Sequence, residues 1–206
     1  MFYKRTYTCF GLLIAMALTS IFGVKKDVSA TTRMVVTQGG LLKVTGSTNI
    51  SNFCYSISNY NNPDTITIYR YNSKNDMLPM NGSLNFNVNS FSSDNNFMTN
   101  EFRKTLKSLQ YPTLTVSFLS INKVPELKPE PENVSGWITV TVAGVTKKYL
   151  VNYTFTSINA GMIKIDGAKT LSFSDFNLEA PKKFGGMIRT KETLDIAFQL
   201  YLKIIN

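Results

Sequence analysis

The chain has 206 residues but contains no histidine and only two cysteines, Cys9 and Cys54. Without histidine, Ser-His-Asp and Cys-His catalysis, histidine-ligated zinc and the usual proton shuttle near neutral pH are all excluded. Two cysteines cannot build a disulfide scaffold or a cysteine-rich metal site. The sequence also lacks a P-loop, a dinucleotide-binding glycine fingerprint and a GxSxG elbow, so no cofactor motif is present. These absences favour binding over catalysis.

Charged residues are also few, at 17% of the chain, whereas apolar residues make up 43%. This composition is typical of a globular protein with a substantial hydrophobic core. The 22 basic residues outnumber the 13 acidic ones, which gives a formal net charge of +9. For an exported protein, the expected counter-charge is anionic lipid or a cell-envelope polymer rather than nucleic acid.

Residues 1–30 have the pattern of a secretory signal peptide. Lys4 and Arg5 precede an apolar run from Cys9 to Val24, and small residues follow at 28–30. The alternative is a membrane anchor, but a spanning helix needs about 20 apolar residues and this run is shorter. We therefore predict cleavage after residue 30, a domain over residues 31–206, and a periplasmic or extracellular location. Cys54 would then be the single cysteine, which we interpret as a small buried hydrophobe.

Alternation of apolar and polar residues dominates the rest of the chain and predicts about eight or nine antiparallel strands with one buried face each. In the longest run, Leu194, Ile196, Phe198 and every second residue up to Ile204 share one face. Other runs begin at Ser83, Thr113, Trp137 and Tyr149, with shorter candidates at 41–45, 53–58, 65–71 and 162–173. Edge strands are avoided either by closing a barrel or by forming a two-sheet sandwich, and the pattern allows both.

Turn chemistry separates the runs. Asn81-Gly82, Ala143-Gly144 and Asp166-Gly167 tolerate positive φ, and we predict turns or interruptions at all three. The proline-rich segment 125–131 predicts a long exposed loop. Its glutamates, together with Glu132, are interpreted as solvated side chains, because nothing nearby would separate their pKa values for acid-base catalysis.

One segment follows a helical period instead. Met98, Phe102, Leu106 and Leu109 fall on one stripe, which predicts an amphipathic helix. Thr99 or Asn100 is available as N-cap, and Pro112 ends the helix. In an all-β chain its apolar face would seal the open end of a barrel. A membrane-surface helix is the alternative.

Four segments together resemble the YceI-like family, in order and over nearly the whole domain. They are GSTNISNF (46–53), MTNEFRKTLKSLQYPTLTVSF (98–118), GWITVTVAGVTKKYLV (136–151) and DFNLEAPKKFGGMIRTKETLDIAFQLYL (175–202). The resemblance implies an eight-stranded, lipocalin-like antiparallel barrel with a helix across one end. It also implies an apolar tunnel for a polyisoprenoid, an isoprenoid quinone or a fatty acyl chain. Family members often carry histidines where this chain has Ser51 and Phe102, so any role of those imidazoles is lost here, and an apolar residue in the helix favours a sealed end.

The leading hypothesis is therefore an exported carrier of one long apolar molecule, since burial of hydrocarbon is worth about 0.8 kcal/mol per CH₂. Ten inward-facing residues are the candidate lining, although each also fits as a core residue that touches no ligand: Phe86, Val88, Val116, Phe118, Val140, Tyr153, Phe155, Ile196, Phe198 and Leu200. Basic residues in predicted turns would attract an anionic head group or membrane surface, or are ordinary solvated side chains: Lys147, Lys148, Lys182, Lys183 and Arg189.

Two further hypotheses remain. A barrel with a solid interior would be an interaction domain of the cell envelope without a small ligand. An enzyme is the third possibility, which we disfavour because acidic residues are sparse and no nucleophile has a candidate base.

Overall fold

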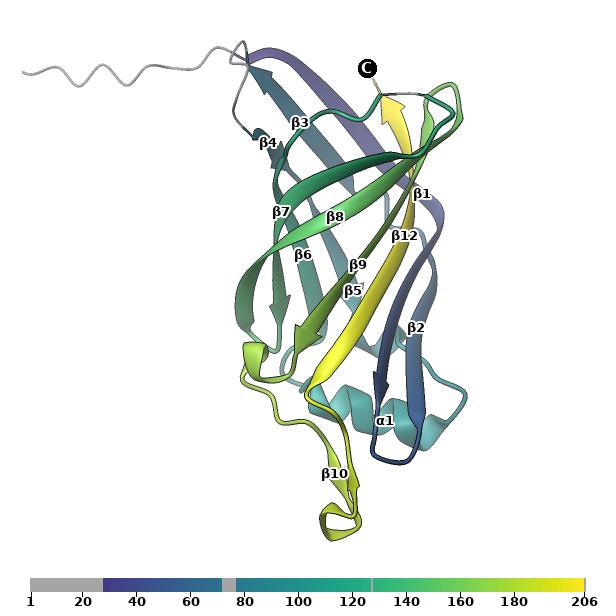
Figure 1. Cartoon of the computed structure of the whole chain (residues 1–206), viewed down its shortest axis with the longest axis vertical. Helices are drawn as coiled ribbons and strands as arrows, with labels where there is room; N and C mark the ends of the chain where they lie inside the picture. The colour runs from purple at the N-terminus through teal and green to yellow at the C-terminus, as the bar shows by residue number, and fades with distance from the viewer. Residues whose placement is uncertain (1–27, 72–76, 127, 206) are drawn as a thin grey trace, which may run out of the picture.

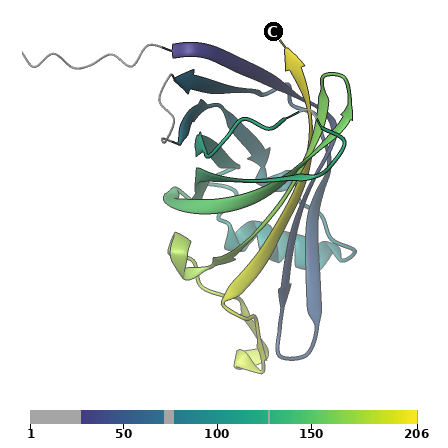
Figure 2. The same cartoon turned by 45° about the horizontal axis from the view of Figure 1, so that its top comes forward.

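The computed structural model describes residues 28–71, 77–126 and 128–205. These residues form a closed, eight-strand antiparallel β-barrel with a single α-helix at one end, as the family resemblance implies (Figure 1). Figure 2 shows the strands curving around a common axis. The strands are β1 (Val28–Ser47), β2 (Asn52–Tyr60), β3 (Thr65–Tyr71), β4 (Leu78–Asn81), β5 (Ser83–Asn87), β6 (Thr113–Ile121), β7 (Glu132–Val142), β8 (Val145–Asn159), β9 (Met162–Ser172), β10 (Lys182–Lys183), β11 (Ile188–Arg189) and β12 (Thr193–Ile205). The helices are α1 (Asn96–Thr105) and the short 3₁₀ turns η1 (Val88–Ser90), η2 (Ser174–Phe176) and η3 (Phe184–Gly186).

Two of the eight strand positions around the barrel are each occupied by two short strands placed end to end. β2 and β3 both pair with β1, and β4 and β5 both pair with β6. The remaining neighbours follow in the order β6, β7, β8, β9 and β12, and β12 pairs with β1 to close the ring. This closure removes the exposed edges that two separate sheets would leave, so the sandwich is excluded. β10 and β11 form a separate small hairpin.

β1 runs the length of the barrel and bends at Gly39-Gly40. Its pairing with β12 shifts register between Thr37 and Leu41. Gly39 has φ +99°, and a side chain on Gly40 would collide with the Tyr60 side chain. A glycine bulge of this kind lets a long strand curve around a barrel.

A tyrosine bridges the seam between β2 and β5, where the described residues form no ladder beyond the single bridge Ser56↔Ser92. The Tyr60 hydroxyl donates to the Asp64 carboxylate and accepts from the Asn85 amide at 3.1 Å. Burial of Tyr60, together with its hydrogen bond to Asp64, raises the pKa of the phenol to about 12. Besides the Ser56–Ser92 backbone bridge, the Tyr60 side chain therefore holds this seam.

The strand faces follow the predicted alternation. In β12, Leu194, Leu200 and Leu202 are buried, whereas the alternate residues Asp195 and Lys203 are exposed. The same parity corrects the interpretation of Cys54, which is exposed. Its neighbours Phe53 and Tyr55 in β2 belong to the hydrophobic core, and an alternating strand turns the sulfur outward between them.

Two of the three predicted turns or interruptions are present, and the first is a turn at Ala143-Gly144. It joins β7 to β8 with φ +48° and +79°, as a tight hairpin requires. Gly82, with φ +140°, interrupts the chain between β4 and β5, and a side chain there would collide with the carbonyl oxygen of Thr65. Gly167 lies inside the continuous strand β9, directly opposite Phe198. The predicted interruption at Asp166-Gly167 is therefore wrong, because glycine also marks close packing within strands.

The helix forms where predicted, but its ends differ. Asn95 is the N-cap, and its side-chain oxygen accepts from the amides of Phe97 at 2.8 Å and Met98 at 3.2 Å. Thr99, a predicted cap, is buried inside the first turn. Leu109 lies beyond the end of the helix and is fully exposed, because the chain reverses at Lys107 with φ +54°.

The predicted signal peptide lies largely outside the described residues. Val28–Ala30 belong to β1, where Val28 pairs with Tyr71 and Ala30 with Arg70. The cleavage site stays a prediction. Within the described ranges, no helix has the length and apolar character needed to cross a bilayer.

Candidate ligand-binding cavity

Two apolar cavities lie inside the barrel, one above the other. The larger has a volume of about 120 Å³ and lies at the α1 end, where it reaches Phe102 and Leu106 of the helix. The smaller, about 20 Å³, lies toward the opposite end, between Met34, Ile66 and Leu202. The barrel interior is therefore not packed solid. Its larger cavity approaches the 150 Å³ of engineered apolar cavities that bind benzene.

Most of the predicted lining residues surround the larger cavity, because alternation gives their strand face correctly. Phe155 lines the smaller cavity instead, and Val88 lies in η1, buried but in the wall of neither. Contact with a ligand stays a prediction for all ten. The eight around the larger cavity are Phe86, Val116, Phe118, Val140, Tyr153, Ile196, Phe198 and Leu200.

Four side chains line both cavities and separate them; we call Phe118, Tyr153, Phe198 and Leu200 the constriction. Tyr153 and Phe198 meet edge to face, with ring centroids 5.9 Å apart. Gly167 pairs with both residues and lies between them in β9, and any side chain there would collide with the Phe198 ring. The absence of a side chain at Gly167 thus gives Phe198 its place in the bore.

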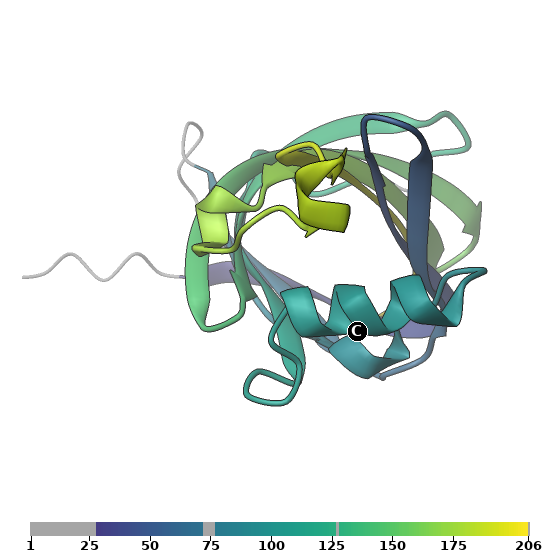
Figure 3. The same ribbon diagram turned by 90° about the horizontal axis from the view of Figure 1, so that it is seen from below.

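Aromatic packing closes the α1 end of the larger cavity. Figure 3, seen from this end, shows α1 lying across the barrel mouth beside the segment that carries η2 and the β10–β11 hairpin. Phe102 stacks on Tyr55 with ring centroids 4.0 Å apart and meets Phe91 edge to face at 5.4 Å. Phe102 is the helix position where the resemblance implies a histidine, and here it forms part of an apolar seal.

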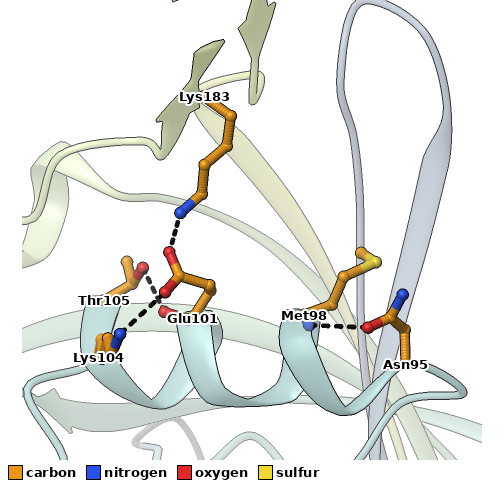
Figure 4. Close-up of polar contacts among 6 residues, drawn as sticks. All are labelled: Asn95, Met98, Glu101, Lys104, Thr105 and Lys183. Atoms are coloured by element: carbon orange, nitrogen blue, oxygen red, sulfur yellow. Dashed lines mark hydrogen bonds and ion pairs between the residues drawn. The ribbon is translucent and has the colours of Figure 1, made fainter. Parts of the chain in front are cut away.

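Polar contacts hold α1 in this place (Figure 4). Glu101 pairs with Lys104 at 3.1 Å and also forms an ion pair with Lys183 of β10. The Thr105 hydroxyl donates to the carbonyl of Glu101 at 2.9 Å. The helix is thus tied both to its own next turn and to the hairpin across the barrel end.

At the same end of the barrel, the residues after β9 form the side of the larger cavity that lies across from α1. Phe173, Phe176 and Leu178 are buried and line the cavity. The Tyr149 hydroxyl donates to Asp175 at 2.9 Å, and the Asp175 carboxylate also accepts from the amide of Ser172. Burial, and then the hydrogen bond to Asp175, raise the pKa of Tyr149. This segment therefore places its hydrogen-bonded polar groups on the outside and its apolar side chains toward the cavity.

The Tyr153 hydroxyl is a polar group within the apolar interior of the barrel. It is buried at the constriction and has no hydrogen-bond partner among the described residues. Burial alone raises the pKa of this phenol. A buried hydroxyl without a partner costs about 1–3 kcal/mol, which a ligand oxygen would recover by accepting its hydrogen bond.

The five predicted loop cations lie in strands and not in turns. Lys147 and Lys148 begin β8, Lys182 and Lys183 form β10, and Arg189 ends β11. Lys148 lies over the Trp137 ring at 4.6 Å. All five belong to the α1 end of the barrel. No group of three or more Cys, Asp or Glu side chains that could hold a metal comes together in the part of the chain that the structure describes.

Sequence analysis missed a set of cavity residues for two reasons. Phe102 and Leu106 carried a clear helical signal but were assigned to a seal instead of the lining. The residues around η2 had no periodic signal, because a 3₁₀ turn follows neither strand nor helix alternation. The missed residues nearest the helix end are Phe91, Phe102, Leu106, Phe173, Phe176 and Leu178.

Comparison with known proteins agrees with this geometry. The sequence model of the YceI-like domain matches residues 26–201. A polyisoprenoid-binding domain from Saccharophagus degradans, implicated in plant cell wall breakdown, superposes with a TM-score of 0.58 at 11% identity, covering 82% of this chain and 97% of that one. BcnA of Burkholderia cenocepacia superposes with a TM-score of 0.53 at 14% identity, covering 79% and 95%. No curated protein matches by sequence. The chain thus belongs to the YceI-like family.

Proposed function

We propose that this protein is an exported carrier that holds one long apolar molecule inside its barrel. The observation that carries the proposal is the apolar cavity enclosed between α1 and the constriction. An enclosed hydrocarbon wall binds alkyl or prenyl chains with about 0.8 kcal/mol for each buried CH₂. A carrier needs no catalytic group, and the described lining of the cavity is mostly apolar, with Tyr149, Tyr153, Lys169 and Ser172 as its residues that carry polar groups.

The ligand that we favour is a polyisoprenoid or fatty acyl chain that carries an oxygen, such as an isoprenoid quinone. The polyisoprenoid-binding domain of similar fold supports the chain. The Tyr153 hydroxyl supports the oxygen, since a carbonyl at the constriction would satisfy a donor that lacks a partner among the described residues. A pure hydrocarbon would leave that donor unpaired.

A long chain would need both cavities, and the constriction separates them. The larger cavity alone has room for a short hydrocarbon segment. Rotation of the Phe198 ring away from Gly167 would join the two spaces into one bore. We therefore propose that the constriction opens when a long ligand enters.

Extraction with organic solvent followed by mass spectrometry tests the carrier function. Protein purified under native conditions should release one lipid species in a stoichiometric amount. Protein that has been unfolded, stripped of lipid and refolded should release none, and should then rebind the same species from an offered lipid extract. A native protein that releases no lipid, and a refolded protein that rebinds none, would leave an interaction domain of the cell envelope without a small ligand as the function.

Export is the second part of the proposal, supported by the signal-peptide pattern of residues 1–30. Fractionation of expressing cells, with determination of the N-terminus of the mature protein, tests it. The expected product starts at or near residue 31 and lies outside the cytoplasm. A cytoplasmic protein that retains Met1 would contradict export without affecting ligand binding.

A further inference from the structure

The α1 end of the barrel presents an unusual group of exposed apolar side chains, which we call the tip surface. Phe184 and Met187 are each 76% exposed at the end of the β10–β11 hairpin, Ile50 is 67% exposed and Phe97 is 64% exposed. Apolar surface that monomeric proteins leave exposed and contiguous marks a site of interaction with a protein or a membrane.

The residues of the tip surface come from three segments that contact one another. The Asn49 side chain donates to the carbonyl of Met187 at 2.9 Å, which docks the β1–β2 turn on the hairpin. The Lys183 amine lies 5.3 Å from the centroid of the Phe97 ring, which brings the start of α1 beside β10. The tip surface is thus one structural unit.

The hairpin projects from the barrel below α1 (Figures 1 and 2). Phe184, Gly185 and Gly186 all have positive φ, between +50° and +93°. This conformation is disfavoured for phenylalanine, yet here the side chain of Phe184 remains largely exposed. A narrow projection of this kind is suited to insertion into a fluid phase such as a lipid bilayer.

The charge around the tip surface identifies the partner. The segment 181–191 contains Lys182, Lys183, Arg189 and Lys191 but no acidic residue. Among the described residues, only Lys183 of these four forms an ion pair, with Glu101. Of the acidic residues at the base of the hairpin, Glu101 pairs with Lys183 and Lys104, and Glu192 accepts from the amide of Ser174, whereas Glu179 is exposed.

From this arrangement we infer that the hairpin is a docking surface for an anionic lipid bilayer. Phe184 and Met187 enter the interface between head groups and acyl chains, while Lys182, Arg189 and Lys191 contact lipid phosphates. Exposed apolar side chains ringed by basic residues bind membranes by this combination of burial and charge. Docking places the α1 end of the larger cavity against the membrane.

Sedimentation with lipid vesicles tests the surface. The purified protein should bind vesicles of equal parts phosphatidylcholine and phosphatidylglycerol, bind phosphatidylcholine alone much more weakly, and be released at high salt. The K182Q/R189Q variant should bind the anionic vesicles roughly thirtyfold more weakly, because each basic residue near the surface contributes about fivefold. The F184S/M187S variant should lose binding to both kinds of vesicle.

Matched changes at the opposite end of the barrel serve as controls. Ile158→Ser removes an exposed apolar side chain from β8, and R33Q/K203Q removes two exposed basic residues from β1 and β12. Both controls should bind like the wild type. Equal binding by the hairpin variants and the controls would overturn the proposal. Loss of self-association in F184S/M187S, without any vesicle binding by the wild type, would instead assign the surface to a second copy of the chain.

The proposal rests on the carrier function only in naming the membrane with which the carrier exchanges its ligand, and the two can fail separately. If the protein releases a lipid on extraction but does not bind vesicles, the carrier function is supported and the docking surface is contradicted. If the protein binds vesicles through the hairpin but holds no lipid, the docking surface is supported and the carrier function is contradicted.

Discussion

The ring of Phe198 occupies the space that a side chain on Gly167 would fill, directly across the β9–β12 ladder. Together with Tyr153, it narrows the bore between the larger and the smaller cavity. In the proposed carrier, this ring would set the chain length that the barrel accepts.

Phe198→Ala is expected to join the two cavities. Loss of the half-buried ring should lower the free energy of unfolding by at most about 3–5 kcal/mol, the cost for a fully buried phenylalanine. At the same time, the affinity for a long fatty acid should rise relative to that for a short one, because the longer chain gains buried CH₂ groups beyond the constriction. Urea denaturation and fluorescent-probe displacement with acids of increasing length measure the two effects.

Ile196→Ala in the same strand is the control, since Ile196 lines only the larger cavity. It should also destabilise the fold, by about 2–5 kcal/mol, but it should leave the dependence on chain length unchanged. If both variants shift that dependence equally, the constriction does not limit the ligand.

Tyr153→Phe should have opposite effects on the free and the loaded protein. Removing an unpaired buried hydroxyl should raise the free energy of unfolding of the empty barrel by about 1–3 kcal/mol. Affinity for a long-chain ketone should fall, by roughly five- to tenfold, while affinity for the matching hydrocarbon should not. Denaturation of stripped protein and calorimetric titration with the two ligands measure both.

Tyr149→Phe is the matched control, because Tyr149 lines the same cavity but its hydroxyl donates to Asp175. This variant should lose about 1.5–3 kcal/mol of stability, the value of a hydrogen bond to a charged group. A Tyr153→Phe barrel that is destabilised like Tyr149→Phe would show that the Tyr153 hydroxyl has a partner in solution.

Asn95→Ala should weaken the seal at the α1 end. The Asn95 side chain caps two amides of the helix, and loss of such a cap costs about 1 kcal/mol. Exchange of amide hydrogens in α1 should accelerate accordingly. Asn96→Ala, one residue later and without a capping contact, should leave both stability and exchange close to those of the wild type.

Alternation in the sequence predicted which strand faces point inward, because that property depends only on residue parity. It could not predict depth along the bore, which depends on strand register. Phe155 therefore lies at the smaller cavity and not the larger one, although it shares a face with Tyr153. The glycine at 167 gave the same signal as a turn glycine, since both positions require the absence of a side chain for different reasons.

The hydrogen-bond partners of the polar residues in the site could not be predicted from the sequence either. Whether a buried tyrosine finds a partner depends on residues far away in the chain, as Asp175 is from Tyr149. Tyr153 resembles Tyr149 in sequence context but finds no such partner among the described residues. Similarly, the tip surface depends on contacts between the β1–β2 turn, α1 and the hairpin, which no local pattern predicts.

Tyr60 makes the stability of the barrel sensitive to alkaline pH. Its pKa is raised to about 12 in the folded protein, against about 10 in the unfolded chain. The folded state thus holds its proton more tightly, so the contribution of Tyr60 is complete below pH 10 and is lost as the pH rises through about 12. Tyr60→Phe removes the hydrogen bond to Asp64 and should lower the free energy of unfolding by about 1.5–3 kcal/mol at pH 8. The difference between wild type and variant should shrink as the pH approaches 12, where the wild-type phenol ionises next to the Asp64 carboxylate. Urea denaturation across this range measures it, and a difference that stays constant from pH 8 to pH 12 would contradict the role of Tyr60 at the β2–β5 seam.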